Sequence, residues 1–461
     1  MAVSPARKVA FEILLRVERD NSYAADLLLS RSNLSSRDHG LATELVMGVL
    51  RWQSLLDRRL AAASSHKSSQ KIERLDSEVR AALRLGAYQL LLLSRVPARA
   101  AIFESVELVK SARKRSAAPF VNAILRKIGA DGTANFFAKI DQSPDSITLA
   151  QNAAHPEWLV TRWAERYGLE TARHICAHDQ RVPATAIHIH GDQSDQDRFF
   201  CEVAEAELRL APGRLLSASR LVLSGDFTAT RAYREGRVSI QDEASQLVAM
   251  LASGREAAGN GGSSDDAILD CCAAPGGKTA LLARSNPRAQ VFAMELHPHR
   301  ARLLRNLSCL PNVHVVAADA RQLPFTRTFH RILADVPCSG TGTLGRNPEI
   351  KGKLTTQDLR DLQSRQVAIL KSALARLATG GLLIYSTCSL EREENEAVIE
   401  AALDGTTEFK VIDLKKELER LQQCGELLPL DIATLLSGRY LRIIPGLHPC
   451  DGFFAALINR R

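Results

Sequence analysis

Apolar and polar residues alternate with a helical period through the first 128 residues of the chain. Apolar side chains recur there at spacings of three and four, which is the pattern of amphipathic helices. The segment 77–93 stops before Pro97, as expected because the residue preceding a proline avoids the helical conformation. The expected helices span 6–17, 24–29, 41–60, 77–93, 103–112 and 120–128.

The next stretch mixes helical and strand periods. A helix is expected from His155 to about Tyr167, and residues 184–190 alternate as a strand. A second helix is expected over 198–208, followed by short strand-like pieces. We interpret residues 141–235 as a small α/β connector domain.

From Val238 onward, short apolar runs alternate with helical segments. This alternation predicts a parallel sheet with helices on both faces, the doubly wound arrangement. The loop 259–266, rich in glycine and serine, is expected to be flexible. The expected strands are 267–271, 290–294, 313–317, 331–335 and 381–386, with further strands near 440–443 and 453–458.

Positive charge is concentrated in the first third of the chain. Residues 1–140 hold 23 Lys and Arg against 13 Asp and Glu, whereas residues 141–461 hold 37 against 39. A basic domain on a near-neutral body is typical of a nucleic-acid docking surface, although many basic faces are simply solvated. The candidate phosphate-contacting residues are Arg7, Lys8, Arg113, Lys114, Arg115, Arg126 and Lys127.

Several classes of protein are disfavoured. The chain has no run of 18 or more apolar residues, so no membrane span is expected, and its charged start lacks the apolar segment of a secretory signal. Nine cysteines without a Cys-x-x-Cys spacing favour neither a disulfide framework nor a zinc site. We therefore expect a cytoplasmic monomer without a metal.

Two cysteines in different settings carry the candidate chemistry. Cys338 comes shortly after the apolar run 331–334 and Asp335, and Cys388 comes shortly after the run 382–385. Catalytic groups collect at the carboxyl ends of strands in an open parallel sheet. Two thiols at that edge, one of them beside an aspartate, predict nucleophilic attack followed by proton removal. Methylation of the unreactive carbon 5 of a pyrimidine needs such a pair.

A loop of small residues after the first strand of this sheet is the candidate ligand site. Small residues allow a ligand to approach backbone amides, and the following helix start favours a carboxylate or phosphate. A nucleoside-triphosphate P-loop would need glycine at position 272, where the chain has cysteine. The loop comprises Cys272, Ala273, Ala274, Pro275, Gly276, Gly277 and Lys278.

Two acidic residues extend this site toward a nucleoside. Glu295 ends the second strand, 18 residues after Gly277, close to the spacing at which an acid binds a ribose diol. Asp319 ends the third strand, where it can reach an adenine. Either acid alone is weak evidence, because acids after strands commonly cap a helix. Together they describe an adenosine pocket that fits S-adenosyl-L-methionine or a dinucleotide, and the two thiols favour the methyl donor.

The chain resembles a known family in four blocks. Residues 272–278, 335–340, 346–349 and 386–389 are similar to the Nop/Sun family of RNA cytosine-5 methyltransferases. Residues 241–245 and 451–454 also fit that family, and residues 48–52 and 120–126 are similar to the NusB RNA-binding fold. The connector departs from the family, because Ile187-His188-Ile189-His190 replaces its usual Arg-Val-Asn strand.

The resemblance implies three domains. Residues 1–140 would be an all-α NusB-like RNA-binding domain, 141–235 the α/β connector, and 236–461 a Rossmann-like methyltransferase domain using S-adenosyl-L-methionine. It also implies methylation of a cytidine at carbon 5, and the NusB-like domain favours 16S ribosomal RNA as the partner. Two alternatives stay open: the same chemistry on transfer RNA, and a non-catalytic RNA-binding factor.

The resemblance also assigns roles to the candidate residues. It makes Cys388 the nucleophile that bonds to carbon 6 and Cys338 the base that removes the proton from carbon 5. DNA cytosine methyltransferases place the nucleophile in a Pro-Cys element, like that of Cys338, so the opposite assignment stays open. Asp335 is expected to hold the edge of the base, and Lys278 to support the loop or the carboxylate of the donor. The residues expected to line the RNA path are Arg346, Asn347 and Lys351.

Overall fold

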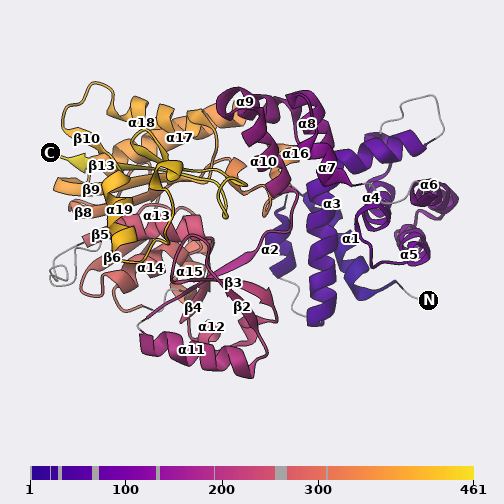
Figure 1. The fold of residues 1–461 in the computed structure, drawn as a ribbon, viewed down its shortest axis with the longest axis horizontal. Coiled ribbons are helices and arrows are strands. Elements are labelled where there is room, and N and C mark those ends of the chain that lie inside the picture. Colours follow the sequence, from indigo (N-terminus) through magenta and orange to yellow (C-terminus); the bar gives the residue numbers. More distant parts are fainter. Residues whose placement is uncertain are drawn as a thin grey trace. The chain divides into compact units, whose positions relative to one another are not determined.

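The computed structural model describes residues 3–20, 22–29, 34–64, 72–130, 135–191, 193–254, 267–307 and 310–461. The chain forms two compact units (Figure 1). The helical unit comprises Met1–Pro183 and Leu344–Lys353, and the sheet unit comprises Ala184–Thr343 and Leu354–Arg461. The predicted loop 259–266 lies outside the described residues. The three-domain division at 1–140, 141–235 and 236–461 stays a prediction.

The described residues of the helical unit form helices and no strands. This confirms the all-helical N-terminal domain, and four more described α-helices after residue 141 belong to the same unit. The helices are α1 Pro5–Arg19, α2 Ala24–Leu29, α3 Ser36–Ala63, α4 Ser77–Leu92, α5 Ala98–Ser111, α6 Ala118–Ala130, α7 Phe136–Asp141, α8 Ser146–Asn152, α9 Glu157–Tyr167, α10 Leu169–Asp179 and α16 Ile350–Lys353.

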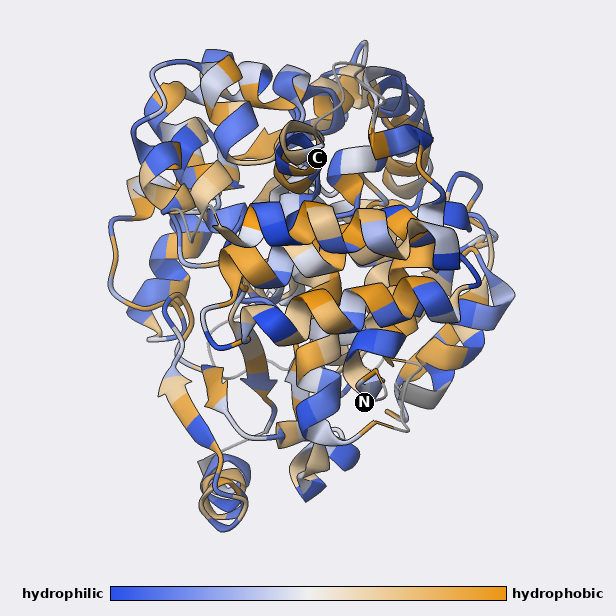
Figure 2. Ribbon diagram, turned by 90° about the vertical axis from the view of Figure 1, so that its right-hand side faces the viewer, coloured by the Kyte–Doolittle hydropathy of each residue, from blue (hydrophilic) through white to orange (hydrophobic). Residues whose placement is uncertain are grey.

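Burial of one apolar face per helix holds the helical unit together. Figure 2 shows hydrophobic and hydrophilic residues alternating along these helices, as the sequence period predicts. Leu45, Leu56 and Leu60 of α3 are fully buried, together with Leu83 and Leu85 of α4. The core of this unit therefore lies along α3 and α4.

A four-stranded antiparallel sheet begins the sheet unit. Its order β2-β3-β1-β4, with one helix after β1 and another after β3, is the split βαβ topology. Ile187, Phe199 and Phe227 lie in its core. The elements are β1 Thr185–Ile189, α11 Gln193–Glu205, β2 Arg209–Pro212, β3 Ser219–Ser224, α12 Arg231–Arg234 and β4 Val238–Ile240. These strands and helices confirm the α/β character predicted for this part of the chain.

The second sheet has nine strands, in the order β11-β12-β13-β9-β8-β5-β6-β7, with β10 paired to β13. Its helices are α13 Glu243–Ser253, α14 Gly277–Ser285, α15 Pro298–Leu307, α17 Thr356–Leu374, α18 Glu396–Leu403 and α19 Lys415–Gln423. Its strands are β5 Ala267–Asp270, β6 Gln290–Glu295, β7 Val313–Ala317, β8 Phe329–Asp335, β9 Leu377–Thr387, β10 Phe409–Ile412, β11 Leu436–Ser437, β12 Tyr440–Ile443 and β13 Phe453–Arg460.

The Rossmann-like prediction is confirmed in β5–β9, the first five strands of this sheet along the sequence, which are parallel. An entirely parallel sheet is not observed, because β10–β13 pair in antiparallel fashion. Separate apolar cores cover the two faces of the sheet. The strand order reverses at β5: the chain runs outward through β6 and β7, then crosses to β8 and β9. Ligands bind at such a switch point, outside the carboxyl ends of the strands.

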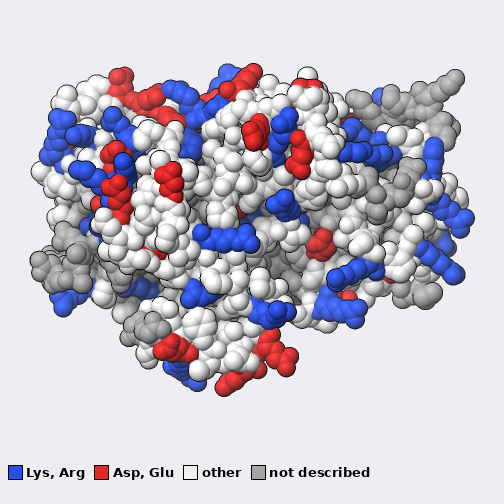
Figure 3. Space-filling view, viewed as in Figure 1, with Lys and Arg blue, Asp and Glu red and all other residues white. Residues whose placement is uncertain are grey.

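The predicted basic patch is only partly exposed. Figure 3 shows more Lys and Arg than Asp and Glu on the visible face around α3–α6. However, Arg7 is buried, where Nε donates to Gln89 (2.7 Å) and Nη1 pairs with Glu104 (2.9 Å). Including Arg7 in the patch was wrong, because its amphipathic helix turns this position toward the core. Lys8, Arg113, Arg115 and Arg126 stay exposed.

None of the described helices combines the length and apolar character that crossing a membrane requires. The described residues also contain no group of three or more His, Cys, Asp or Glu side chains that could hold a metal ion.

Candidate active site

The two candidate thiols meet at the carboxyl ends of neighbouring strands. Cys338 follows β8 and Cys388 follows β9, and these strands run parallel with Asp335 opposite Ser386. The two Sγ atoms lie 3.3 Å apart across 50 residues of sequence. Both cysteines are free and half-buried. The shared sheet edge therefore places two thiols in hydrogen-bonding contact.

Asp335 lies beside the thiols, and two neighbouring side chains hold its carboxylate in place. Lys278 Nζ is 2.8 Å from Asp335 Oδ2, and the Ser386 hydroxyl donates to Oδ1 over 2.8 Å. Burial alone would lower the pKa of Lys278, but the Asp335 carboxylate, its hydrogen bond and charge on Cys388 and Asp270 raise it above its usual value. Lys278 is therefore a cation that joins Asp335 to the thiol site.

Cys338 is held in its protonated form. The pKa of this thiol is well above its ordinary value, first because of its hydrogen bond with Cys388 and then because of burial. Negative charge on Cys388, Glu394 and Asp335 raises the pKa further. A thiol that keeps its proton is a poor nucleophile.

A buried glutamate holds the two cysteine loops together, and we did not predict it. Glu394 is fully buried, and its carboxylate accepts hydrogen bonds from the Ser339 amide (2.8 Å), the Ser389 hydroxyl (2.5 Å) and the Gln366 amide group (2.9 Å). The Ser339 hydroxyl is a further donor. Because Ser339 and Ser389 each follow a candidate thiol, Glu394 fixes both cysteine loops. Only its place six residues after Cys388 was visible in the sequence.

Two glycines allow close packing behind Cys388. The Gly342 amide donates to the Cys388 carbonyl (2.9 Å), and the Gly452 amide donates to the Gly342 carbonyl (2.8 Å). A Cβ on Gly342 would lie 2.6 Å from Gly452 O and 2.9 Å from Cys388 O. The backbone carrying Cys388 therefore has no room for a side chain at position 342.

The loop of small residues runs from β5 to α14, as predicted. Its Ala273 amide donates to the Met294 carbonyl (2.7 Å), which ties the loop to β6. Gly276 has φ +113°, a conformation that favours glycine. Ala273 is buried, Pro275 is exposed, and Cys272, Ala274, Gly277 and Lys278 lie in between.

Two buried oxygens near this loop have no hydrogen-bond donor among the described residues. They are Asp270 Oδ1, at the end of β5, and Gln241 Oε1, whose side chain lies 3.5 Å from the position of a Cβ on Gly277. The other Asp270 oxygen accepts from the Thr279 hydroxyl (2.7 Å). Burial raises the pKa of Asp270 to about 6, against the opposing effect of that bond. We did not predict a role for Asp270, although it comes only two residues before the loop.

The two acidic residues predicted for a nucleoside lie at the ends of the neighbouring strands. Glu295 is buried at the end of β6, and its Oε1 accepts from the His297 amide (3.0 Å). Asp319 follows β7, and Arg321 pairs with it through Nε and Nη2 (2.9 and 2.6 Å). Hydrogen bonds from Arg321 lower the pKa of Asp319. The structure thus places both acids along the same sheet edge as the loop.

The residues expected along the RNA path belong to the helical unit, whereas both thiols belong to the sheet unit. Arg346, Asn347 and Lys351 belong to the segment Leu344–Lys353, which is part of the helical unit. Arg346 and Asn347 are half-buried. Lys351 is buried, and its Nζ donates to the Arg51 carbonyl (2.7 Å) and to Gln180 Oε1 (3.2 Å). Lys351 is thus a buried structural donor and not an exposed RNA contact.

Known protein families match residues of both units. Residues 262–459 match the family described as 16S rRNA methyltransferase RsmB/F, and residues 4–130 match the NusB family. A probable ribosomal RNA small subunit methyltransferase B of Bacillus subtilis is 33% identical over the full length of both chains. The ribosomal RNA small subunit methyltransferase B of Pseudomonas syringae is 33% identical over 82% of each chain.

Solved structures share the fold. The crystal structure of PH0851 superimposes with a TM-score of 0.77 over 99% of both chains, at 21% identity. The structure of NSun6 from Pyrococcus horikoshii with SFG has a TM-score of 0.53 and 19% identity, covering 66% of this chain and 98% of that one.

Proposed function

Because the chain belongs to the RsmB/F family of 16S rRNA methyltransferases, we propose that it methylates carbon 5 of a cytidine in 16S ribosomal RNA, with S-adenosyl-L-methionine as the donor. The observation that carries this proposal is the 3.3 Å contact between the Cys338 and Cys388 thiols beside the Asp335–Lys278 pair. A single thiol would suffice for many reactions. Two thiols fit a reaction that must both attack a ring and release it.

Cys388 is the nucleophile in this proposal. Its thiolate adds to carbon 6 of the cytosine, which makes carbon 5 electron-rich enough to take a methyl group. Two observations support this assignment. The raised pKa keeps Cys338 protonated, and the Lys278 ammonium interacts favourably with negative charge on Cys388. Lys278 therefore stabilises the thiolate that attack requires.

The remaining residues donate and accept the protons that the reaction requires. The Asp335–Lys278 pair holds the edge of the base and supplies a proton to ring nitrogen 3 as negative charge develops there. The hydrogen bond and charge of Cys388 that hold the proton on Cys338 are lost once Cys388 is bonded to the ring. Cys338 then releases its proton to solvent and, as a thiolate, takes the proton from carbon 5 after methyl transfer. The electrons of that C–H bond then restore the ring double bond and expel Cys388 as a thiolate.

The small-residue loop suits S-adenosyl-L-methionine. When bound, the donor supplies an electrophilic methyl group on a sulfonium. Ala273, Ala274 and Gly276 leave room for a ligand against the backbone, and Asp270 Oδ1 and Gln241 Oε1 are buried acceptors suited to its ammonium group. Glu295 would hold the ribose hydroxyls. Asp319 would contact the adenine after releasing Arg321.

Single cysteine variants test the chemistry. Each is incubated with 16S rRNA and donor, then run on a denaturing gel. Cys338→Ala should accumulate a covalent RNA–protein adduct, because attack proceeds but release does not. Cys388→Ala should form none. The opposite pattern would reverse the two roles, and the absence of adduct from both variants would contradict the covalent mechanism.

Bisulfite sequencing tests the substrate. RNA from cells lacking the gene is compared with RNA from the parent strain. Loss of signal at a single 16S cytidine is the expected result. Unchanged 16S rRNA with an altered transfer RNA would reject the ribosomal substrate and leave the chemistry standing.

A further inference from the structure

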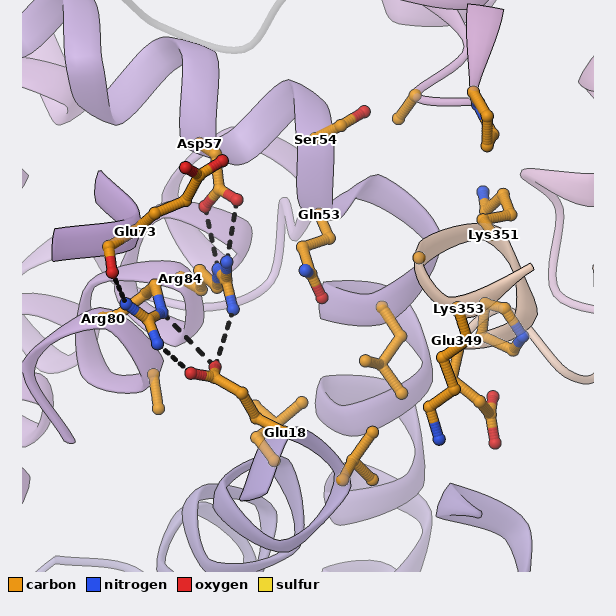
Figure 4. A pocket seen from close by; sticks show the side chains of 18 of the residues that line it. Glu18, Gln53, Ser54, Asp57, Glu73, Arg80, Arg84, Glu349, Lys351 and Lys353 are labelled. Atoms are coloured by element: carbon orange, nitrogen blue, oxygen red, sulfur yellow. Dashed lines mark hydrogen bonds and ion pairs between the residues drawn. The ribbon is translucent and has the colours of Figure 1, made fainter. Parts of the chain in front are cut away.

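A cavity of about 600 Å³ lies within the helical unit, and no residue of the thiol site lines it. Helices α1, α3 and α4 form one side, and residues 348–353 form the other (Figure 4). Figure 4 shows Glu18, Arg80 and Arg84 at one end and Glu349 and the two lysines at the opposite end.

At the end with the arginines, the positive charges are already paired with carboxylates. Arg84 Nε and Nη2 each donate to Asp57 over 2.8 Å, and Arg84 Nη1 donates to Glu18 over 3.1 Å. Arg80 pairs with the same glutamate and donates to the Glu73 and Leu75 carbonyls. Two cations are thus balanced by two carboxylates, so this end has no spare positive charge with which to hold a phosphate.

The opposite end holds an acceptor without a donor. Glu349 is 5% exposed, and its Oε1 accepts from the Ala24 amide (2.9 Å). Its Oε2 is buried and makes no hydrogen bond to any residue that the structure describes. The neighbouring lysines donate elsewhere: Lys351 to Arg51 and Gln180, and Lys353 to the Ser22 carbonyl (3.2 Å). A buried carboxylate oxygen is unfavourable without a donor, so this end is built to receive one.

The walls of the cavity are partly apolar, with Leu14 and Val17 of α1, Leu50 of α3 and Pro348 among the lining residues. Figure 4 shows the polar side chains of Gln53 and Ser54 between the two ends. The positive charge of Lys353 interacts favourably with Glu349, so it partly balances the carboxylate at the end with the free oxygen. The cavity therefore suits an uncharged group with apolar faces and N–H donors along one edge.

We propose that this cavity receives an unpaired guanine base of the RNA substrate, with Glu349 accepting hydrogen bonds from the guanine N1–H and 2-amino groups. Guanine is the RNA base that presents two adjacent donors on its pairing edge, and proteins read RNA sequence mainly from splayed-out bases. The ribose and phosphate stay outside the cavity. The proposal rests on the function proposed above and adds a second base-reading site in the helical unit.

Nucleotide binding to the full-length protein tests this proposal. Equilibrium dialysis with radiolabelled GMP, AMP, CMP and UMP should give the tightest binding for GMP. Glu349→Gln should reverse this preference. Because Oε1 must keep accepting from Ala24, the new amide group directs its N–H₂ into the cavity, where it meets the N–H donors of guanine. We expect GMP affinity to fall at least tenfold while UMP affinity does not fall.

Matched variants keep this test independent of folding. Glu170→Gln changes an exposed carboxylate of the helical unit that does not line the cavity, and it should leave GMP binding unchanged. Thermal melting and donor binding by calorimetry should show that Glu349→Gln remains folded. Equal binding of all four nucleotides to the parent protein, or undiminished GMP binding by Glu349→Gln, would overturn the proposal. So would binding of arginine or spermidine in place of GMP.

The two proposals fail in different ways. A protein that methylates 16S rRNA but has no preference for GMP would refute the guanine site and leave the function standing. A protein that binds GMP through Glu349 but forms no 5-methylcytidine would support the site and refute the function.

Discussion

Lys278 Nζ lies 2.8 Å from Asp335 Oδ2, although one residue lies at the start of a helix and the other at the end of a strand, 57 residues apart in the sequence. Lys278 is the second residue of α14 and the last residue of the small-residue loop, and Asp335 ends β8, three residues before Cys338. This ion pair therefore joins the candidate donor loop to the candidate base site. Its cation also interacts with charge on Cys388, so one side chain serves both sides of the reaction.

Replacing Lys278 with methionine should nearly abolish methyl transfer. The variant keeps an unbranched side chain but loses the cation, which lies 5.2 Å from the Phe453 ring centroid, stabilises the Cys388 thiolate and supplies a proton to the base. Loss of such a group typically lowers kcat by about 10²–10⁴-fold. Single-turnover methylation measures this, with the exposed Lys416→Met as control. Activity within threefold of the parent protein would exclude both roles of Lys278.

Glu394→Gln should loosen both cysteine loops. The amide can accept through one oxygen only, so a donor from Ser339, Ser389 or Gln366 is left facing its N–H₂. An unsatisfied buried donor costs about 1–3 kcal/mol. Urea denaturation should show this loss, and kcat should fall more than RNA affinity. Glu400→Gln removes only an exposed pair with Arg392, and should change stability by less than about 1 kcal/mol.

Gly342→Ala should displace Cys388. The new methyl group would overlap the Gly452 and Cys388 carbonyls, and overpacking of this kind costs about 1–3 kcal/mol. We expect a lower denaturation midpoint and slower adduct formation in a Cys338→Ala background. Gly40→Ala is the control, because no atom lies within 4 Å of a Cβ there. A fully active Gly342→Ala protein would show that the Cys388 backbone can shift freely.

Lys351 should make the stability of the helical unit depend on pH. Burial lowers the pKa of Lys351 from 10.5 to about 7, against the opposing charges of Asp179 and Cys176. Between these values the unfolded chain binds a proton that the folded protein has released. The free energy of unfolding should therefore rise with pH in this window, by at most about 1.4 kcal/mol per pH unit.

The variant Lys351→Met isolates this contribution. The difference in unfolding free energy between parent and variant should change steadily from pH 7 to pH 10, and should be constant below pH 6. Lys8→Met, an exposed change on α1, should show no such dependence. A pH-independent difference for Lys351→Met would mean that the buried lysine titrates normally.

The sequence predicted the site residues that come at or just after the end of a strand better than those whose role depends on contacts between loops. Cys338, Cys388 and Asp335 each come after a short apolar run, and parallel strands must bring such positions to one edge. Glu394 was missed because its role depends on two serines that precede it by 55 and 5 residues. Acids at the start of a helix are common, and no local pattern separates a buried one from an exposed one.

The sequence also failed to predict which long charged side chains are buried. Arg7 and Lys351 were both predicted to contact RNA because of their charge, yet both are buried in the helical unit. Arg7 finds Gln89 and Glu104, and Lys351 finds a carbonyl of α3, all distant in sequence. The strands β12 and β13 were predicted, but their antiparallel direction was not, because apolar runs specify a strand without specifying its direction.

Mild oxidation should inactivate the protein reversibly by linking Cys338 to Cys388. The two sulfurs are 3.3 Å apart, and a disulfide needs about 2.05 Å, so a small movement closes the bond. Diamide would take up the two electrons and two protons that the thiols lose. The proposed mechanism needs both thiols free, so methyl transfer should stop and then return with dithiothreitol. Peptide mapping should find the 338–388 link in the parent protein and in Cys424→Ser, whose exposed thiol lies outside the site. Inactivation of the parent without this link would mean that a different cysteine is the sensitive one.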